Sequence, residues 1–477
     1  MINKITKINR NLIAEKLFKA LEPISGLESI SLVGSICDKD DISVISDIDT
    51  IVICTVLDEM FFKSCIDALH CISGADLGLP DRKIFINSTF GPLKFDRPDL
   101  IVIHLMIYDL QGHKEHVLKS PFTCLDWERS SLFFGKSLRE IYPVHRLQPN
   151  HFVASRRGLR NYLEDVREGV ISYRRYTFQD GKPKESTETY KLDSKHQGEY
   201  AFHIVKYMIS NYLKMISGEN IQYSDNKLFS LWEKCLPECA YFIPFYKVLR
   251  DLKVKRSAEY PQGTVKEVEN LLVSFEKAFS KRWNFSLKLI FARHGRTALN
   301  DGSFLGQGRN PELMESLEPL EYKVKAAFSS PLKRALMSAK ELSPKANVIL
   351  DPRLSEINYG MAEGLFLDEL RTTFPDLYES WRRGEDARFP DGENHSDVMN
   401  RLKLFLDSLK EKSGTLLVVT HNVVIRCLIG MHWDIPISNW YKIKIPHARE
   451  IELLFFEGQY YLNLDSHTKE MMTDSLL

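Results

Sequence analysis

The hydrophobic pattern of this sequence changes twice along the chain, and each change predicts a domain boundary. Residues 1–148 contain short apolar runs such as SISLVGS, DTIVICTVL and LIVIHLMIYDL, which are typical of strands. Residues 149–285 show mainly helical periodicity, and residues 286–477 alternate strand and helix patterns. At 477 residues the chain is also long for one hydrophobic core. We therefore expect a multidomain α/β protein with a helical middle region.

Segments within these regions carry further predictions. The N-terminal stretch MINKITKINRNLIAEKLFKAL has the charge and apolar pattern of an amphipathic helix rather than of a signal peptide. Helical periodicity runs through residues 153–176, 197–216 and 265–283. The polar stretch between Phe178 and Gln197 predicts a long exposed loop between helices.

In the C-terminal region, the strand patterns LKLIFA, KAAFSS, NVILD and TLLVVT are separated by helical patterns. This alternation predicts a mostly parallel sheet with helices on both faces, an α/β/α sandwich. Polar motifs follow three of the strands: Arg293-His294-Gly295, Ser329-Ser330 with Arg334, and Thr420-His421-Asn422. Because sites in such sheets lie at the carboxyl ends of strands, we expect the motifs to meet there.

Composition argues against several classes of function. Lysine plus arginine equals aspartate plus glutamate at 64 each, so no basic excess predicts a nucleic-acid or membrane partner. No apolar window approaches the length of a membrane span. The eight scattered cysteines fit a reduced compartment, and only Cys235 and Cys239 lie close together, without further ligands at zinc spacing. We expect a cytoplasmic protein that acts on small molecules.

The C-terminal motifs contain the residue types that phosphoryl transfer needs. Phosphoryl oxygens bind arginines and the N–H groups of helix starts, and Arg293 and Arg334 qualify for this role. A histidine such as His294 can hold the group covalently if its attacking nitrogen is neutral. Glu356, on a loop after NVILD, is placed to protonate the leaving oxygen and then to activate water.

The segment from about 287 to 465 resembles the histidine phosphatase superfamily, which has the phosphoglycerate mutase-like fold. Four motifs carry the resemblance, in order: RHGRTALN, SSPLKRA, LSEINYGMAEG and LLVVTHNVVIR. The resemblance implies a nucleophile, a proton donor, a second catalytic histidine and a set of phosphate-binding residues. In this chain these are His294, Glu356 and His421, and then Arg293, Arg334, Thr297 and Asn300. It also implies a phosphorylated small molecule as substrate and no cofactor for this domain.

Two local features refine this expectation. In PDGENHS, Asp391 stands where the family-like pattern has its first glycine. We therefore expect Glu393 to keep the role of the glutamate in that pattern, while the local turn differs from the family's. The stretch WRRGEDARFPDGE offers Arg382, Arg383 or Arg388 to a second anionic group of the substrate. The short span between RHG and SSPLKRA favours a phosphatase over a mutase.

The N-terminal string LVGSICDKDDISVISDIDTIVI contains a second possible site. Asp47 and Asp49 are two apart on a predicted strand, so their side chains share one face and can jointly hold a divalent metal. Paired carboxylates that face a triphosphate suit Mg²⁺. The turn at Gly34 and Ser35 would supply N–H groups and a hydroxyl to the phosphates.

This string resembles the polymerase-β-like nucleotidyltransferase superfamily, with G-S followed after about ten residues by D-x-D. The resemblance implies a nucleotidyltransferase-like α/β domain in residues 1–148, a nucleoside triphosphate as partner and Mg²⁺ as cofactor. The family usually has a third acidic residue on a later strand. Here either Asp109 serves, or His104 replaces the acid, or the metal site is incomplete.

Three hypotheses follow. The first is a bifunctional enzyme with an N-terminal nucleotidyltransferase, a helical accessory region (149–285) and a C-terminal phosphatase (286–477). The second is a phosphatase whose N-terminal module is inactive and binds a nucleotide or a partner. In the third, both modules sense ligands without turnover.

Overall fold

The structure is a computed structural model, in which the described residues are 10–38, 47–89, 99–129, 131–144, 147–154, 159–217, 225–255, 257, 259–433 and 435–463. The chain divides into two compact units, residues 1–278 and 279–477. The finer boundaries at residues 148 and 285 stay predictions. Among the helices of the described residues, none is long and apolar enough to cross a membrane.

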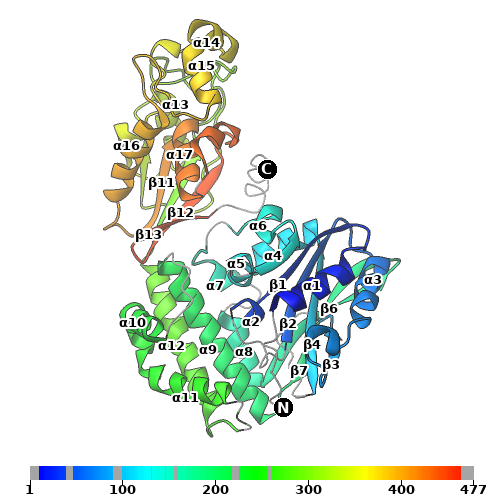
Figure 1. Ribbon diagram of the computed structural model, residues 1–477. Helices are drawn as coiled ribbons and strands as arrows, with labels where there is room; N and C mark the ends of the chain where they lie inside the picture. Colours follow the sequence, from blue (N-terminus) through cyan, green and yellow to red (C-terminus); the bar gives the residue numbers. More distant parts are fainter. Residues whose placement is uncertain are drawn as a thin grey trace. The chain divides into compact units, whose positions relative to one another are not determined.

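The first unit contains a five-stranded sheet in the order β3-β4-β2-β1-β5 (Figure 1). β2, β3 and β4 are mutually parallel, whereas β1 and β5 continue the sheet in antiparallel pairs. The strands are β1 (Leu27–Val33), β2 (Asp47–Cys54), β3 (Lys83–Asn87), β4 (Leu100–Asp109) and β5 (Ser131–Gly135). Buried residues run consecutively along β1, β2 and β4, and because successive side chains point to opposite faces, both faces of this sheet are covered.

Helices α1 (Arg10–Leu21) and α3 (Glu59–His70) pack on one face of this sheet through a shared apolar core. The other face packs against α6 (Leu138–Ile141) and Trp127 of α5 (Pro121–Arg129). Shorter elements complete the layer: α2 (Ser35–Asp38), the 3-10 helix η1 (Ala75–Leu77) and α4 (Leu110–Lys119). Residues 1–9 of the predicted N-terminal helix lie outside the described residues.

The rest of the first unit is largely helical, as predicted. The long helices α9 (Ser194–Ser217) and α12 (Thr264–Asn284) confirm two of the expected segments. The others are α7 (His151–Ala154), α8 (Leu159–Glu168), α10 (Asp225–Cys235), η2 (Pro237–Phe242) and α11 (Ile243–Val254).

The prediction of a helix to residue 176 followed by a long loop is wrong. α8 ends before Gly169, which has a positive φ of 65°, and a hairpin of β6 (Val170–Gln179) and β7 (Lys182–Lys191) follows. Asp180 and Gly181 form the turn, both with positive φ, which is the Asp-Gly signature of a tight hairpin. Tyr176 and Phe178 then pack their rings against Phe62 of α3. The β-branched and aromatic residues of β6 and this packing outweigh the helical pattern.

The second unit contains a six-stranded sheet in the order β10-β9-β11-β8-β12-β13. The first four strands are parallel, and β12 and β13 complete the sheet in antiparallel pairs. Their bounds are β8 (Leu287–Arg293), β9 (Ala326–Ser329), β10 (Val348–Leu350), β11 (Gly414–Thr420), β12 (Glu450–Phe456) and β13 (Gln459–Asn463).

Helices cover both faces of this sheet, which confirms the predicted sandwich. α13 (Lys333–Leu342) packs on one face, and α16 (His395–Asp407) and α17 (Asn422–His432) pack on the other (Figure 1). The remaining elements are α14 (Leu367–Thr373), α15 (Pro375–Arg382) and the 3-10 helices η3 (Pro352–Leu354), η4 (Gly360–Ala362) and η5 (Ile437–Lys442).

Candidate active site

The carboxyl ends of three parallel strands bring the predicted C-terminal motifs together. Arg293, at the end of β8, is the register partner of Thr420 at the end of β11. The His294 N–H donates to the Thr420 carbonyl over 3.0 Å, and the Ser330 N–H donates to the Val419 carbonyl over 3.1 Å. Motifs far apart in the sequence therefore form one site, as expected for an open parallel sheet.

His294 is held in the tautomer that a nucleophile needs. Its side chain is buried, and its Nδ1 lies 2.7 Å from the main-chain oxygen of Gly295. Because a carbonyl oxygen only accepts, Nδ1 carries the proton and Nε2 keeps its lone pair. Burial and the charge of Arg334 lower the pKa of His294 well below its ordinary value, so the ring is neutral.

His421 supplies the second imidazole, with its ring centroid 5.1 Å from that of His294. Its Nε2 lies 2.8 Å from the hydroxyl of Ser330, which also accepts from the Leu332 N–H. The tautomer in which His421 Nε2 accepts the Ser330 proton has its own proton on Nδ1. This Nδ1 is buried without a partner among the described residues. An N–H group in such a position can bind a phosphate oxygen.

Two arginines place positive charge beside these histidines. Arg334 is fully buried, and its η-nitrogens donate to the carbonyls of Gly306 and Arg309 over 2.8 and 3.2 Å. Arg293 donates from Nη1 to the Ile445 carbonyl over 2.6 Å. Burial lowers the pKa of both arginines, that of Arg293 to about 10. Carbonyl oxygens orient these cations without neutralising them, so the site favours an anionic ligand.

Glu356 lies at the same site as a buried carboxyl group. Its Oε1 accepts from the N–H groups of Ile357 and Val423, over 2.9 and 3.2 Å. Val423 belongs to the first turn of α17. Burial nevertheless raises the pKa of Glu356, so this group retains its proton at higher pH than an exposed glutamate. These properties fit a proton donor.

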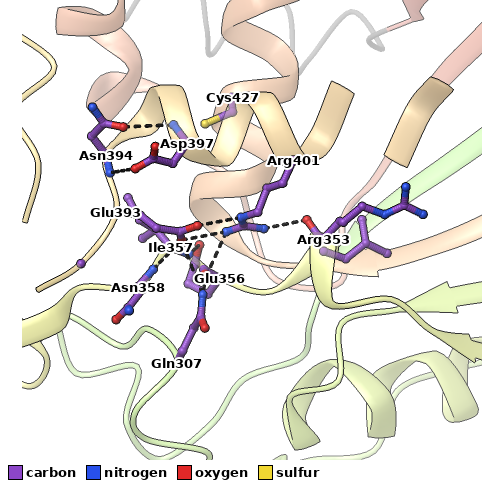
Figure 2. A network of polar contacts seen from close by, with 12 residues as sticks. Gln307, Arg353, Glu356, Ile357, Asn358, Glu393, Asn394, Asp397, Arg401 and Cys427 are labelled. Atoms are coloured by element: carbon purple, nitrogen blue, oxygen red, sulfur yellow. Dashed lines mark hydrogen bonds and ion pairs between the residues drawn. The ribbon is translucent and has the colours of Figure 1, made fainter. Parts of the chain in front are cut away.

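Hydrogen bonds from Arg401 and Gln307 hold the main chain of Glu356 in place (Figure 2). Arg401 donates to both oxygens of Glu393, over 3.0 and 3.2 Å, and to the carbonyls of Arg353 and Glu356, over 2.6 and 3.2 Å. Gln307 also donates to the Glu356 carbonyl, over 2.7 Å. Glu393 thus acts on the site through Arg401.

Asp391 adopts a positive φ of 54° at the position where the family-like pattern has glycine. Aspartate is among the few side chains that tolerate this region, so the turn survives the substitution. Gly360 packs against the same turn, where a Cβ would lie 2.0 Å from the Pro390 carbonyl oxygen.

Other predicted residues have different surroundings. Thr297 donates from its N–H and its hydroxyl to the Asn300 side chain, over 2.8 and 3.1 Å, so this pair shapes the turn after the nucleophile. The three arginines expected at a second anionic group each form an exposed ion pair, and their role at the substrate stays a prediction. Arg382 binds Glu379, Arg383 binds Glu385 and Arg388 binds Asp397.

Two residues near the site, Arg426 and His447, were not predicted from the sequence. Arg426 is coupled electrostatically to Arg293, Glu356 and Tyr359. An arginine inside the apolar helical run NVVIRCLIG was a signal that could have pointed to it. His447 reaches the His294 carbonyl from 153 residues away in the sequence, and no local pattern marks it.

In the first unit, Asp47 and Asp49 lie on one face of β2 as predicted. The main chain of Gly34, with φ of 76°, lies against Asp49, since a Cβ there would be 2.6 Å from Oδ2. Burial, and then the charge of Asp47, raise the pKa of Asp49 to about 7. Two carboxylates in this arrangement repel each other and favour a cation between them.

The strand register separates the two candidates for a third metal ligand. His104 of β4 is the register partner of Asp49, whereas Asp109 is the partner of Cys54. Asp109 therefore lies five residues farther along the strand, roughly 16 Å away. It caps α4 by accepting from the Gly112 N–H over 2.6 Å. The alternative in which Asp109 joins the aspartate pair is wrong.

Comparisons with known proteins concern the second unit. The family model described as the histidine phosphatase superfamily (branch 1) matches residues 289–465. Phosphoserine phosphatase 1 of Hydrogenobacter thermophilus is 27% identical over 176 residues, which cover 34% of this chain and 83% of that protein. The probable phosphoglycerate mutase GpmB of Erwinia tasmaniensis is 30% identical over 169 residues, covering 31% and 76%. The 6-phosphofructo-2-kinase/fructose-2,6-bisphosphatase of Caenorhabditis elegans is 29% identical over 171 residues. These residues cover 33% of this chain and only 36% of that protein.

Proposed function

Since the C-terminal part of this chain belongs to the histidine phosphatase superfamily and is a phosphatase of that type, we propose that it hydrolyses a small phosphomonoester through a phosphohistidine on His294. The observation that supports the covalent step is the hydrogen bond from His294 Nδ1 to the Gly295 carbonyl. It leaves Nε2 unprotonated beside two arginines and beside Glu356, a carboxyl group whose pKa is raised by burial.

In the first step, the Nε2 lone pair of His294 attacks phosphorus and the bond from phosphorus to the ester oxygen breaks. Arg293, Arg334 and the N–H of His421 bind the charge on the phosphoryl oxygens. The carboxyl proton of Glu356 passes to the departing oxygen, which leaves as an alcohol. The products of this step are phosphohistidine and the Glu356 carboxylate.

In the second step, the Glu356 carboxylate takes a proton from water as the water oxygen attacks phosphorus. The bond between phosphorus and Nε2 breaks, and inorganic phosphate leaves. His294 regains its lone pair and Glu356 its proton, so the cycle closes without an external acid or base.

Rapid quenching with a ³²P-labelled substrate tests this mechanism. The wild-type protein should form a labelled enzyme that survives alkali and loses its label in acid, as a phosphohistidine does. His294→Ala should lose both label and turnover. His432→Asn is a matched control, because His432 also contacts a main-chain carbonyl, that of Leu428, on the far turn of α17. Turnover that survives in His294→Ala contradicts the proposal.

We also propose that the substrate carries a second acidic group, which Arg426 binds. Arg426 is partly buried, donates from Nε to the Ile443 carbonyl over 2.8 Å, and shares the electrostatic surroundings of Arg293 and Glu356. Within the described parts of the chain, no carboxylate forms an ion pair with it. Such a guanidinium is suited to a carboxylate or a second phosphate.

A matched pair of substrates tests the role of Arg426. Phosphoserine and phosphoethanolamine differ by one carboxylate. The wild-type protein should therefore prefer phosphoserine by about tenfold in kcat/KM, which is the contribution expected from one hydrogen bond to a charged group. Arg426→Met should remove most of this preference while phosphoethanolamine turnover changes little. An unchanged preference in the variant rules out this role.

For the first unit we propose a nucleotidyltransferase-like function that uses a nucleoside triphosphate and Mg²⁺. The observation that favours it is the placement of Asp47 and Asp49 on one face of β2, with the main chain of Gly34 packed against Asp49. In the described residues no group of three potential metal ligands occurs, but Mg²⁺ commonly takes only one or two carboxylates and completes its shell with water and phosphate oxygens. The two aspartates therefore fit Mg²⁺, which would supply positive charge to the phosphates when bound.

Pyrophosphate release from nucleoside triphosphates over a panel of hydroxyl and phosphate acceptors tests this second proposal. Release should require Mg²⁺ and disappear in the double variant Asp47→Asn, Asp49→Asn, while phosphatase activity persists. Mg²⁺-dependent nucleotide binding without release would instead indicate an inactive binding module. Absence of both overturns the proposal for this unit.

A further inference from the structure

The loop at residues 445–448 is fastened to the nucleophile motif by three hydrogen bonds. The Ile445 carbonyl accepts from Arg293 Nη1 over 2.6 Å, and the Ala448 N–H donates to the Arg293 carbonyl over 2.9 Å. Between them, His447 Nδ1 lies 2.9 Å from the His294 carbonyl oxygen. Ala448 adopts a positive φ of 56°, an unfavourable conformation for alanine. The loop is thus held in a specific shape against the motif.

The hydrogen bond from His447 fixes one side of the peptide group between His294 and Gly295. The N–H of this peptide group donates to the Ser338 hydroxyl over 2.9 Å on its other side. Glycine has more backbone freedom than other residues, so this peptide group needs such contacts to keep one orientation. Its orientation matters because the next carbonyl, that of Gly295, accepts the Nδ1 proton of His294.

His447 also lies beside the reacting ring. Its ring centroid is 5.4 Å from that of His294, and the ring planes are inclined by 60°. Burial and the charge of Arg293 lower the pKa of His447, so the imidazole is neutral and has a single N–H. Because the His294 carbonyl accepts, that N–H is on Nδ1.

We propose that His447 is a positioning residue that orients the nucleophile through the His294–Gly295 peptide group. By fixing this peptide group together with Ser338, it fixes the carbonyl that selects the tautomer of His294. The role concerns the rate of attack and not the affinity for phosphate, which the arginines supply. The inference rests on the phosphohistidine mechanism proposed above.

Three substitutions at residue 447 test this role. In His447→Asn the amide nitrogen stands at the same distance along the side chain as Nδ1, so the donor is kept. In His447→Gln the amide is one carbon farther away, and His447→Leu has no donor. We expect kcat to fall at least about tenfold in the Leu and Gln variants, with KM changed less than about twofold, and to stay within about threefold in the Asn variant.

Single-turnover labelling locates the effect in the reaction. Formation of the phosphoenzyme should slow in His447→Leu and recover in His447→Asn, while the thermal midpoints of the variants agree. Equal rates in all three variants, or losses confined to KM, overturn the positioning role. If the wild-type protein forms no phosphoenzyme at all, the proposed mechanism fails instead, so the two failures are distinguishable. His432→Asn again serves as the control.

Discussion

Replacing Arg401 with methionine should destabilise the phosphatase unit and slow its chemistry at the same time. Arg401 forms a two-point ion pair with Glu393 and also donates to the carbonyls of Arg353 and Glu356 (Figure 2). Methionine keeps much of the apolar stem but removes every donor. The change therefore breaks the support of Glu356 without touching its side chain.

The expected size of the effect follows from burial. The Arg401 and Glu393 side chains are only 16% and 21% exposed, so removal of one partner leaves a charge in a poorly solvated place. Breaking a buried pair in this way costs about 3–5 kcal/mol, and partial exposure favours the lower end, about 3 kcal/mol. The double variant with Glu393→Gln should cost less than the sum of the two single changes, because the stranded charge is removed as well.

Loss of phosphatase activity with urea measures this stability in the full chain, because every residue of the pocket lies in residues 279–477. With a urea dependence of about 2 kcal/mol per molar, the midpoint should fall by about 1.5 M. Without urea, kcat should fall about tenfold on an alkyl phosphate, since Glu356 is less well placed. It should fall much less on p-nitrophenyl phosphate, whose leaving group needs no proton.

Two results would refute this reasoning. A midpoint shift under about 0.3 M would show that the Arg401 network contributes little to stability, as exposed pairs do. Equal losses of kcat on the alkyl and the aryl ester would show that Arg401 does not act through the proton donor. Arg388→Met is the matched control, because Arg388 also pairs with a carboxylate but is 55% exposed, and both readouts should stay unchanged.

Three further predictions concern other residues. Burial raises the pKa of Glu356, so kcat for alkyl esters should fall as rising pH removes its proton, and a profile without any fall toward alkaline pH contradicts its role as acid. Gly360→Ala should lower the urea midpoint of phosphatase activity by an amount that corresponds to about 3 kcal/mol or more of unfolding free energy. At this positive φ, a Cβ would lie 2.0 Å from the Pro390 carbonyl oxygen, and an unchanged midpoint would show that the turn can move. The pKa of Asp49 is raised from 3.8 to about 7 on folding, so its destabilising effect grows as pH rises through this window and reaches a few kcal/mol above it. Asp49→Asn should therefore raise the melting temperature of the first unit at pH 8 and not at pH 4, and equal gains at both values contradict the assignment.

The sequence predicts that the motifs of the second unit meet, because three of these motifs begin where an apolar strand ends. A run such as LKLIFA indicates a buried parallel strand, and the order of strands brings its last residues to one edge. Register then fixes Arg293 beside Thr420. Nothing in these motifs indicates Arg401 or His447, whose contacts depend on how a helix and a distant loop pack on that edge.

In the first unit, prediction failed where tertiary packing decided between two local patterns. Residues 170–176 fit a helical period, but the Asp180-Gly181 turn and the packing of Tyr176 and Phe178 on Phe62 favour a hairpin. The polar residues of β7 gave no apolar signal, since most of that strand is exposed. The Asp-Gly pair between strand-like residues was the local signal for the hairpin.

The hydrogen bonds around His104 bear on whether its imidazole can bind a metal ion together with Asp47 and Asp49. The Asn87 oxygen accepts from the N–H and the hydroxyl of Thr89, so its Nδ2 is the group that faces His104 Nδ1, 2.9 Å away. Nδ1 must then accept this hydrogen bond, and the neutral ring has its proton on Nε2. In this tautomer the Nδ1 lone pair accepts from Asn87 and is not available to a metal. A magnesium ion here would therefore depend on Asp47 and Asp49 as its protein carboxylates, which is why their double substitution is the decisive variant for this unit.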